Sequence, residues 1–193
     1  MTSLTNCQDK IQYQFQDISL LETALTHRSY LNENREIKES NERLEFLGDA
    51  VLELVTSEFL YNTERELPEG KLTALRAKIV QTKTLAKVAH TLDLPEYIRL
   101  SKGEAASGGA QNTSILADLV EAIIGSIYLD GGLAAAKHFI TIHLLNQYQQ
   151  FTQNMEVEDW KSQLQEVVQA QGGIAPTYEV IKEEGPDHDR IFT

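Results

Sequence analysis

Acidic side chains recur at helical spacing in two separate segments of the sequence. In the stretch NERLEFLGDAVLEL, the acids Glu42, Glu45 and Asp49 are three and four residues apart. At 100° per residue they fall within about 60° of one another on a helix. Asp118 and Glu121 repeat the one-turn spacing in ILADLVEAIIG. Two such helices could together hold a divalent cation. The alternative is that each set belongs to an ordinary solvated helix face.

The kind of metal follows from the ligand type. Magnesium prefers octahedral oxygen ligands and keeps several waters, so a few carboxylates with open positions suit it. No cluster of His or Cys in the sequence competes for a softer metal. A site of this kind can activate a water and neutralise charge on a phosphodiester.

Apolar residues form a face of their own on each of these segments. In the first segment the predicted core stripe lies more than a quarter-turn from the acids and consists of Leu44, Leu47, Val51, Leu54 and Val55. Phe46 lies nearer the acids than this stripe, so we expect an exposed aromatic, which in a dimer would be a contact. The second stripe is Ile115, Leu119, Ile123 and Ile127. Gly125 completes that face and would let another helix come close.

Helical spacing of apolar residues dominates the first 150 positions, which predicts an all-helical first domain. The expected helices are a piece ending before Phe15, then 19–26, 42–62, 69–81, 84–92, 114–129 and 133–149. The DGG at 130–132 should end a helix where glycine can take a left-handed conformation. The small, polar stretch Gly103 to Ser114 predicts a mobile loop, and it is not a P-loop because no Gly-Lys-Ser/Thr follows its glycines.

The pattern changes after about residue 152. Residues 160–170 continue as a helix, PTYEVIKEE alternates as a strand would, GPDHD makes a turn and RIFT begins another strand. We therefore divide the chain into a helical domain, 1–152, and the first part of a small α/β domain, 157–193.

Charge and composition bear on partners and compartment. The net charge of −12 over 193 residues argues, taken alone, against nucleic acid. Between Lys71 and Lys102, however, seven basic residues face two acidic ones, after an acidic band from Glu42 to Glu58. This fits a protein that grips a polyanion and holds cations, or two solvated faces. The single Cys7 and an N-terminus without a signal-like or membrane-spanning run predict a cytoplasmic protein with no membrane partner.

Several of these stretches resemble one family. NERLEFLGDAVLEL is similar to the signature of ribonuclease III, the double-stranded-RNA endonuclease, and SGGAQNTSILADLVEAIIGSIYLDGG to its second characteristic block. LLETALTHRSY also matches, and WKSQLQEVVQAQG with PTYEVIKEEGPDHDRIFT resembles the start of the double-stranded-RNA-binding domain that follows. The resemblance spans essentially the whole chain.

The resemblance implies roles for particular residues. The metal-binding catalytic carboxylates would be Glu45, Asp49, Asp118 and Glu121, with Mg²⁺ as the ion and Mn²⁺ as a possible substitute. Glu42 would lie near the scissile strand, and Phe46 would insert into the partner of a homodimer. Each subunit would cut one strand of double-stranded RNA and leave 5′-phosphate and 3′-hydroxyl ends with short 3′ overhangs. Processing of ribosomal and messenger RNA would be its role.

The second domain would read duplex shape across the minor groove. Its candidate RNA contacts are Ser162, Gln165 and His188, whereas His27 and Trp160 are read as structural. Three features depart from the family pattern. Ala110, Gln111 and Asn112 stand where basic residues are usual, and from Val157 on eight acidic residues face three basic ones. A third strand and a final basic helix are also lacking, so we expect 157–193 to be unstable alone.

Two alternatives to an active enzyme remain at this point. A catalytically silent RNA-binding or ribosome-associated relative would keep the fold but lose acids, and none is lost. A protein–protein scaffold would explain Phe46 and the net charge but not two matched acidic pairs.

Overall fold

The structure is a computed structural model in which residues 4–149, 168, 172, 183–184 and 191–192 are described. Residues 4–149 are helical, as predicted. The helices are α1 (Leu4–Ile11), α2 (Ile18–Ala24), α3 (Arg28–Leu31), α4 (Glu42–Thr63), α5 (Glu69–Val80), α6 (Thr82–Thr91), α7 (Lys102–Ala106) and α8 (Thr113–His143). Short 3₁₀ turns are η1 (Leu94–Glu96), η2 (Gly109–Gln111) and η3 (Leu145–Gln147).

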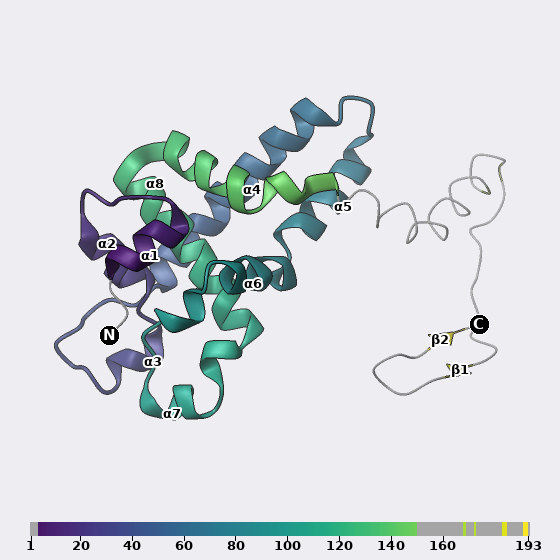
Figure 1. Cartoon of the computed structure of the whole chain (residues 1–193). Helices are drawn as coiled ribbons and strands as arrows, with labels where there is room; N and C mark the ends of the chain where they lie inside the picture. The colour runs from purple at the N-terminus through teal and green to yellow at the C-terminus, as the bar shows by residue number, and fades with distance from the viewer. Residues whose placement is uncertain (1–3, 150–167, 169–171, 173–182, 185–190, 193) are drawn as a thin grey trace. The chain divides into compact units, whose positions relative to one another are not determined.

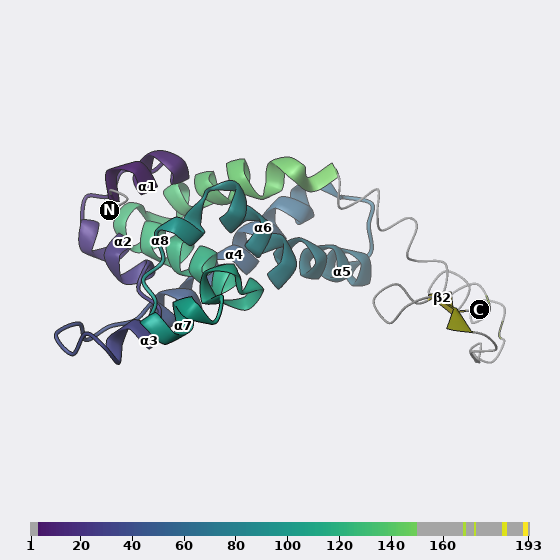
Figure 2. The same ribbon diagram turned by 60° about the horizontal axis from the view of Figure 1, so that its bottom comes forward.

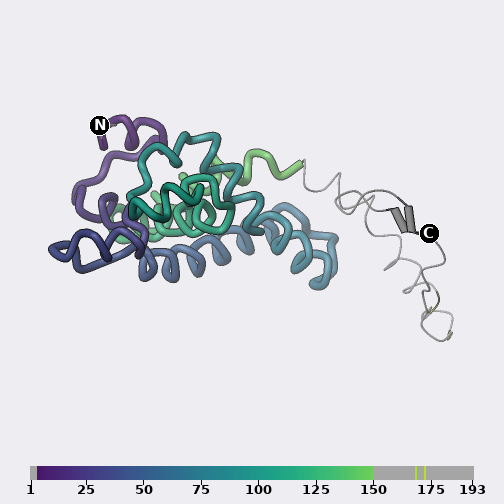
Figure 3. Tube along the Cα trace, turned by 90° about the horizontal axis from the view of Figure 1, so that it is seen from below, coloured from purple at the N-terminus to yellow at the C-terminus, as the bar shows by residue number. Residues whose placement is uncertain are grey.

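Helix α8 is the centre of the helical unit, with α2, α4 and α6 packed against it (Figures 1 and 2). Nearly every residue of its first half is buried, from Leu116 to Ile127, apart from Asp118 and Glu121, which are partly exposed. Helix α4 lies along one side of the unit in Figure 3, and α5 packs against it. The two helices that carry the predicted acids are therefore direct neighbours.

Glycines set how closely α4 and α8 approach. A Cβ on Gly48 would lie 1.8 Å from the Glu121 carbonyl oxygen, and one on Gly125 would lie 2.2 Å from the Leu44 carbonyl oxygen. Side chains at either position would force the two backbones apart. The close approach predicted at Gly125 is confirmed, and Gly48 supplies its counterpart on α4.

The predicted break at DGG is confirmed as a kink inside α8. Gly132 has φ +77° and ψ −176°, a backbone conformation that side chains disfavour. Just before it, the Asp130 carboxylate accepts hydrogen bonds from the Tyr13 hydroxyl at 2.7 Å and from the backbone N–H groups of Gln16 and Asp17 at 3.0 and 2.8 Å. The kink therefore also anchors the segment between α1 and α2.

Two expectations were wrong. The stretch Gly103 to Ser114 is not an irregular loop, because α7 and η2 form within it and Asn112 starts α8. Leu54 is not a core residue: its side chain is 57% exposed, and Leu47 is only partly buried. The other three residues of the predicted stripe, Leu44, Val51 and Val55, are buried, and the buried face of α4 extends on their other side to include Gly48, Leu52, Thr56 and Leu60. This shift follows from the close helix contact at Gly48, which draws that side of α4 toward α8.

By internal contacts the chain divides into two compact units, residues 1–152 and 153–193. In the second unit β1 (Glu183–Glu184) pairs antiparallel with β2 (Ile191–Phe192), Glu183 opposite Phe192 and Glu184 opposite Ile191. A strand at RIFT is thus confirmed. Of the predicted helix at 160–170 only residue 168 is described, and it is helical; the strand residues Tyr178 to Ile181 lie outside the described residues.

Candidate metal centre

The start of α4 is fixed by backbone hydrogen bonds around Asn41. Its N–H donates to the Thr26 carbonyl at 2.8 Å, and its carbonyl accepts from the Glu45 N–H at 2.8 Å. Asn41 is 1% exposed, so this end of the helix is held inside the fold. Glu45 is therefore presented from the first turn of a firmly anchored helix.

The start of α8 is fixed by its N-cap. The Asn112 side-chain oxygen accepts from the Ser114 and Ile115 N–H groups at 2.9 and 3.3 Å. This cap fixes where α8 begins. Asp118 and Glu121, one turn apart in the helix, lie on the side that faces α4.

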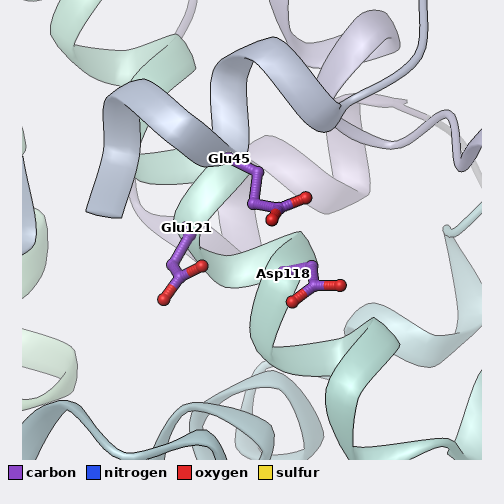
Figure 4. Close-up of side chains that lie close together, drawn as sticks. All are labelled: Glu45, Asp118 and Glu121. Carbon is purple, nitrogen blue, oxygen red and sulfur yellow. The ribbon is translucent and has the colours of Figure 1, made fainter. Parts of the chain in front are cut away.

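Three carboxylates from the two helices converge at one point (Figure 4). Ligand oxygens of Glu45, Asp118 and Glu121 all lie within 4.8 Å of one another. Oxygens bound to a single octahedral Mg²⁺ lie at most about 4.2 Å apart, because each metal–oxygen bond is about 2.1 Å. The acidic centre, defined as Glu45, Asp118 and Glu121, therefore has the donor type that a small divalent cation prefers, and its oxygens within 4.8 Å of one another need to approach by at most about 0.6 Å to share one ion.

Burial raises the pKa values of the three carboxyl groups of the acidic centre, and repulsion from neighbouring carboxylates adds to the effect at two of them. The pKa of Glu121 is raised to about 8, first by desolvation and then by the charges of Asp49, Asp118 and Glu45. Desolvation also raises the pKa of Glu45, with Asp118, Glu42 and Asp49 adding to the effect. The pKa of Asp118 is raised by desolvation and lowered in part by His27. A bound cation would relieve this cost.

The other two predicted acids lie beside the centre. Asp49 is exposed, outside the group of three, but its charge contributes to the raised pKa values of Glu45 and Glu121. Glu42 is exposed and is held by the Ser40 hydroxyl at 2.8 Å and by Arg28 at 3.6 Å. Both carboxylates are therefore near enough to act on the centre electrostatically.

A cavity of about 880 Å³ opens beside these acids. Its walls come from residues of α3, α4, α7 and the start of α8 and from their flanking positions. The described residues that line it are His27, Arg28, Ser29, Asn32, Asn41, Glu42, Glu45, Glu104, Asn112, Ser114, Ile115 and Asp118, of which only Ile115 is apolar. Sequence spacing gave no sign that His27 and Arg28 belong to this wall, since they precede α4 by more than a dozen residues. The signal available in the sequence was that THRSY belongs to a stretch resembling the family.

Phe46 is 80% exposed, as predicted from its helical angle. The candidate RNA contacts Ser162, Gln165 and His188 lie outside the described residues, as does Trp160. His27 does have the structural role expected of it, because its side chain caps α3 by accepting from the Ser29 N–H.

One helical stretch, Thr113–Gln147, is long and apolar enough to cross a membrane by length and composition. Half of its most apolar window is buried within the helical unit. A core helix of a globular domain passes the same test, and this stretch also carries Asp118 and Glu121.

The helical fold and the acidic centre fit a class of protein, the metal-dependent nucleases built from helices. Comparison with known proteins gives the family. A model described as ribonuclease-III-like matches residues 17–148, and a double-stranded RNA binding motif matches residues 160–193. The chain belongs to the ribonuclease III family and is an endoribonuclease of that class, which acts on double-stranded RNA.

Individual relatives agree with this assignment. Ribonuclease 3 of Enterococcus faecalis is 50% identical over 189 residues, which cover 97% of this chain and 82% of that protein. The nuclease domain of Campylobacter jejuni ribonuclease III is 40% identical with a TM-score of 0.68, covering 78% of this chain and 96% of that one. A second structure of that domain, 41% identical with a TM-score of 0.67, covers 73% and 98% of the two chains. It was described for structural flexibility in a region involved in its dimer formation.

Proposed function

We propose that Glu45, Asp118 and Glu121 bind Mg²⁺, or Mn²⁺ in its place, and that this acidic centre is where the chain hydrolyses double-stranded RNA. The observation that carries the proposal is the convergence of the three carboxylates within 4.8 Å from two helices locked together by Gly48 and Gly125. Asp49 supports the same centre by adding negative charge beside Glu121.

The chemistry divides between the ion and the chain. When bound, a divalent cation neutralises charge on the phosphodiester and makes a water more acidic. The chain's part is to supply carboxylates in their ionised form, to fix their directions through two capped or anchored helix starts, and to leave the cavity side open for a strand of RNA. Because the pKa of Glu121 is about 8 without metal, binding of the cation releases a proton near neutral pH.

We further propose that the enzyme works as a homodimer in the cytoplasm, with Phe46 inserted into the partner subunit. The support is the 80% exposure of this ring beside the acids, together with the dimer-forming region described for the Campylobacter relative. Each subunit would cut one strand, and water attack would leave 5′-phosphate and 3′-hydroxyl ends with short 3′ overhangs. Ribosomal and messenger RNA precursors are the proposed substrates.

The test is cleavage of an end-labelled RNA duplex with Mg²⁺ at low salt. We expect Glu121→Gln to lose at least 100-fold in metal-dependent rate, on the order of 3 kcal/mol, while duplex binding is retained. Glu66→Gln, an exposed carboxylate in the turn after α4, is the matched control and should cleave like the natural chain. Equal cleavage by Glu121→Gln and the control would overturn the proposal.

A further inference from the structure

The His27 side chain is held by hydrogen bonds on one of its two ring nitrogens. Nδ1 accepts from the Ser29 backbone N–H at 3.3 Å and lies 2.9 Å from the Ser29 hydroxyl oxygen. That oxygen accepts from the Ser101 N–H at 3.0 Å, so its own proton is available to donate to Nδ1. Ser101 is in turn the N-cap of α7. The ring is therefore fixed through a chain of contacts that joins α3 to α7.

These contacts decide the tautomer. Since Nδ1 is an acceptor, the proton of a neutral His27 is on Nε2, which is a hydrogen-bond donor. The backbone is fixed as well, because the His27 N–H donates to the Arg99 carbonyl at 3.1 Å. No hydrogen bond of Nε2 is found within the described part of the chain. The fold thus orients the Nε2–H of His27 as a hydrogen-bond donor, and this donor has no acceptor among the described residues.

The unused donor belongs to a residue in the wall of the cavity beside the acidic centre. His27 and Asp118 line the same cavity, and a protonated His27 ring is close enough for its charge to lower the pKa of the Asp118 carboxyl. Asn41, in the same wall, is 1% exposed, and its side-chain nitrogen has no partner among the described residues. Such an unpaired buried donor is costly, and an acceptor oxygen would remove part of the cost.

The chemistry of the wall indicates what would provide that oxygen. Among the described residues that line the cavity, all but Ile115 are polar. Four are carboxylates, Glu42, Glu45, Glu104 and Asp118, and Arg28 is the one Lys or Arg. Binding of a nucleobase usually needs an aromatic or apolar surface for stacking, and the described residues of this wall offer only Ile115. A ribose-phosphate backbone presents hydroxyls that can donate to carboxylates and oxygens that can accept from His27 and Arg28, and a cation at the acidic centre would offset the repulsion between phosphate and carboxylates.

We propose that the Nε2–H of His27 donates a hydrogen bond to the ribose-phosphate backbone of the strand being cut, at a nucleotide next to the scissile bond. His27 then has two separable roles. Nδ1 caps α3 and serves stability, whereas Nε2 contacts substrate. The inference rests on the proposed location of hydrolysis at Glu45, Asp118 and Glu121.

Two substitutions separate the roles. In His27→Asn the side-chain oxygen takes the place of Nδ1, and Asn is a favoured N-cap residue, so the cap is kept while the Nε2 donor is lost. In His27→Gln the longer amide places an N–H donor near the position of Nε2, and the cap is weakened. A purely structural His27 would make the Gln variant the more damaged one in every assay.

The experiment measures kcat/KM for duplex cleavage with Mg²⁺ and the Tm of the whole chain for both variants. We expect His27→Asn to keep its Tm and lose about tenfold in kcat/KM, and His27→Gln to melt a few degrees lower but cleave within about threefold of the natural chain. Cleavage by His27→Asn equal to that of the natural chain would overturn the proposal. So would two variants that rank in cleavage as they rank in Tm.

A second readout identifies the oxygen. Single 2′-deoxy substitutions are placed in turn at each of the nucleotides flanking the cut. A position that slows the natural chain but not His27→Asn would identify a 2′-hydroxyl as the acceptor, whereas additive losses at every position would exclude the 2′-hydroxyls. Failure of the metal-site proposal would show separately, as normal cleavage by Glu121→Gln, because the His27 comparison requires only that the natural chain cleaves the duplex.

Discussion

At the scale of single residues, the acidic centre is built at a cost to the metal-free protein. Glu121 is the clearest case, because its carboxyl is both partly buried and surrounded by the charges of Asp49, Asp118 and Glu45. Removing a charge from water and adding like charges beside it both favour the protonated form. The burial and clustering that suit these carboxylates to a cation therefore destabilise the fold when no cation is bound.

This cost makes stability depend on pH in a defined direction. The folded-state pKa of Glu121, about 8, is above its ordinary value of 4.5, so between these values the unfolded chain ionises while the folded chain stays protonated. Stability without metal should therefore fall as pH rises from 4.5 to 8 and then level off. Glu121→Gln should remove this loss and be more stable by about 1 to 2 kcal/mol at pH 8, less than the full shift implies because the carboxyl is partly exposed.

Thermal melting in a chelator over this pH range checks the prediction, with Glu66→Gln as the control. Excess Mg²⁺ should reverse the order, because a cation bound only to the folded state raises the Tm of the natural chain. A Glu121→Gln protein that melts lower than the natural chain at pH 8 in chelator would contradict the electrostatic account.

The sequence predicted the identity of the acids better than their arrangement. Helical spacing placed Glu45, Asp118 and Glu121 correctly on two faces, but Asp49 has the same spacing and lies outside the group of three. Which acids come together depends on how α4 packs against α8, and helical spacing alone does not specify that tertiary contact. His27 could not be placed in the cavity wall from spacing. Its N–H donates to the Arg99 carbonyl, and the hydroxyl of its neighbour Ser29 accepts from the Ser101 N–H, both more than 70 residues away in sequence.

At the scale of helices, the distance between α4 and α8 is what assembles the centre. Each helix contributes acids, and neither could hold a cation in three-fold coordination by itself. Gly48 and Gly125 allow backbone-to-backbone contact, so the site depends on two residues that have no side chain. The longer helices and most of their ends followed from periodicity, but the short α3 and α7 did not, and this close approach was predicted on one helix only.

A methyl group at Gly48 tests whether the site depends on the close contact between α4 and α8. Its Cβ would lie 1.8 Å from a backbone oxygen that cannot move alone, so Gly48→Ala should cost about 3 kcal/mol or more and also abolish cleavage. Gly103→Ala is the matched control, since nothing lies within 4 Å of a Cβ there and alanine favours the helix. Urea denaturation and duplex cleavage of both variants give the comparison. A Gly48→Ala protein as stable as Gly103→Ala would refute the role assigned to the contact.

At the scale of the whole molecule, α4 presents large apolar side chains to solvent. Phe46 is 80% exposed, Leu54 57% and Tyr61 74%, and on a helix all three fall within about 80° of one another. An exposed stripe of this kind usually marks an interface. It also explains why Leu54 was assigned to the core from sequence: an apolar residue that meets a second subunit has the same pattern as one that meets its own fold.

Removal of the Phe46 ring should weaken self-association of the chain. We expect Phe46→Ala to raise the dissociation constant of the dimer by about tenfold or more, because a buried aromatic anchor typically contributes 2 kcal/mol or more. Ile18→Ala on α2, where the side chain is 39% exposed, is the control and should leave association unchanged. Sedimentation over a range of concentrations distinguishes a 21.7 kDa chain from its dimer. Identical behaviour of the two variants would remove Phe46 from the proposed interface.

The central claim is that a cation binds between Glu45, Asp118 and Glu121, and anomalous diffraction from crystals of the chain grown with Mn²⁺ tests it most directly. We predict a peak within about 2.5 Å of an oxygen from each of the three carboxylates, which is absent from crystals of Glu121→Gln under the same conditions. An active protein whose manganese peak lies elsewhere, or lies unchanged in Glu121→Gln, would contradict the account.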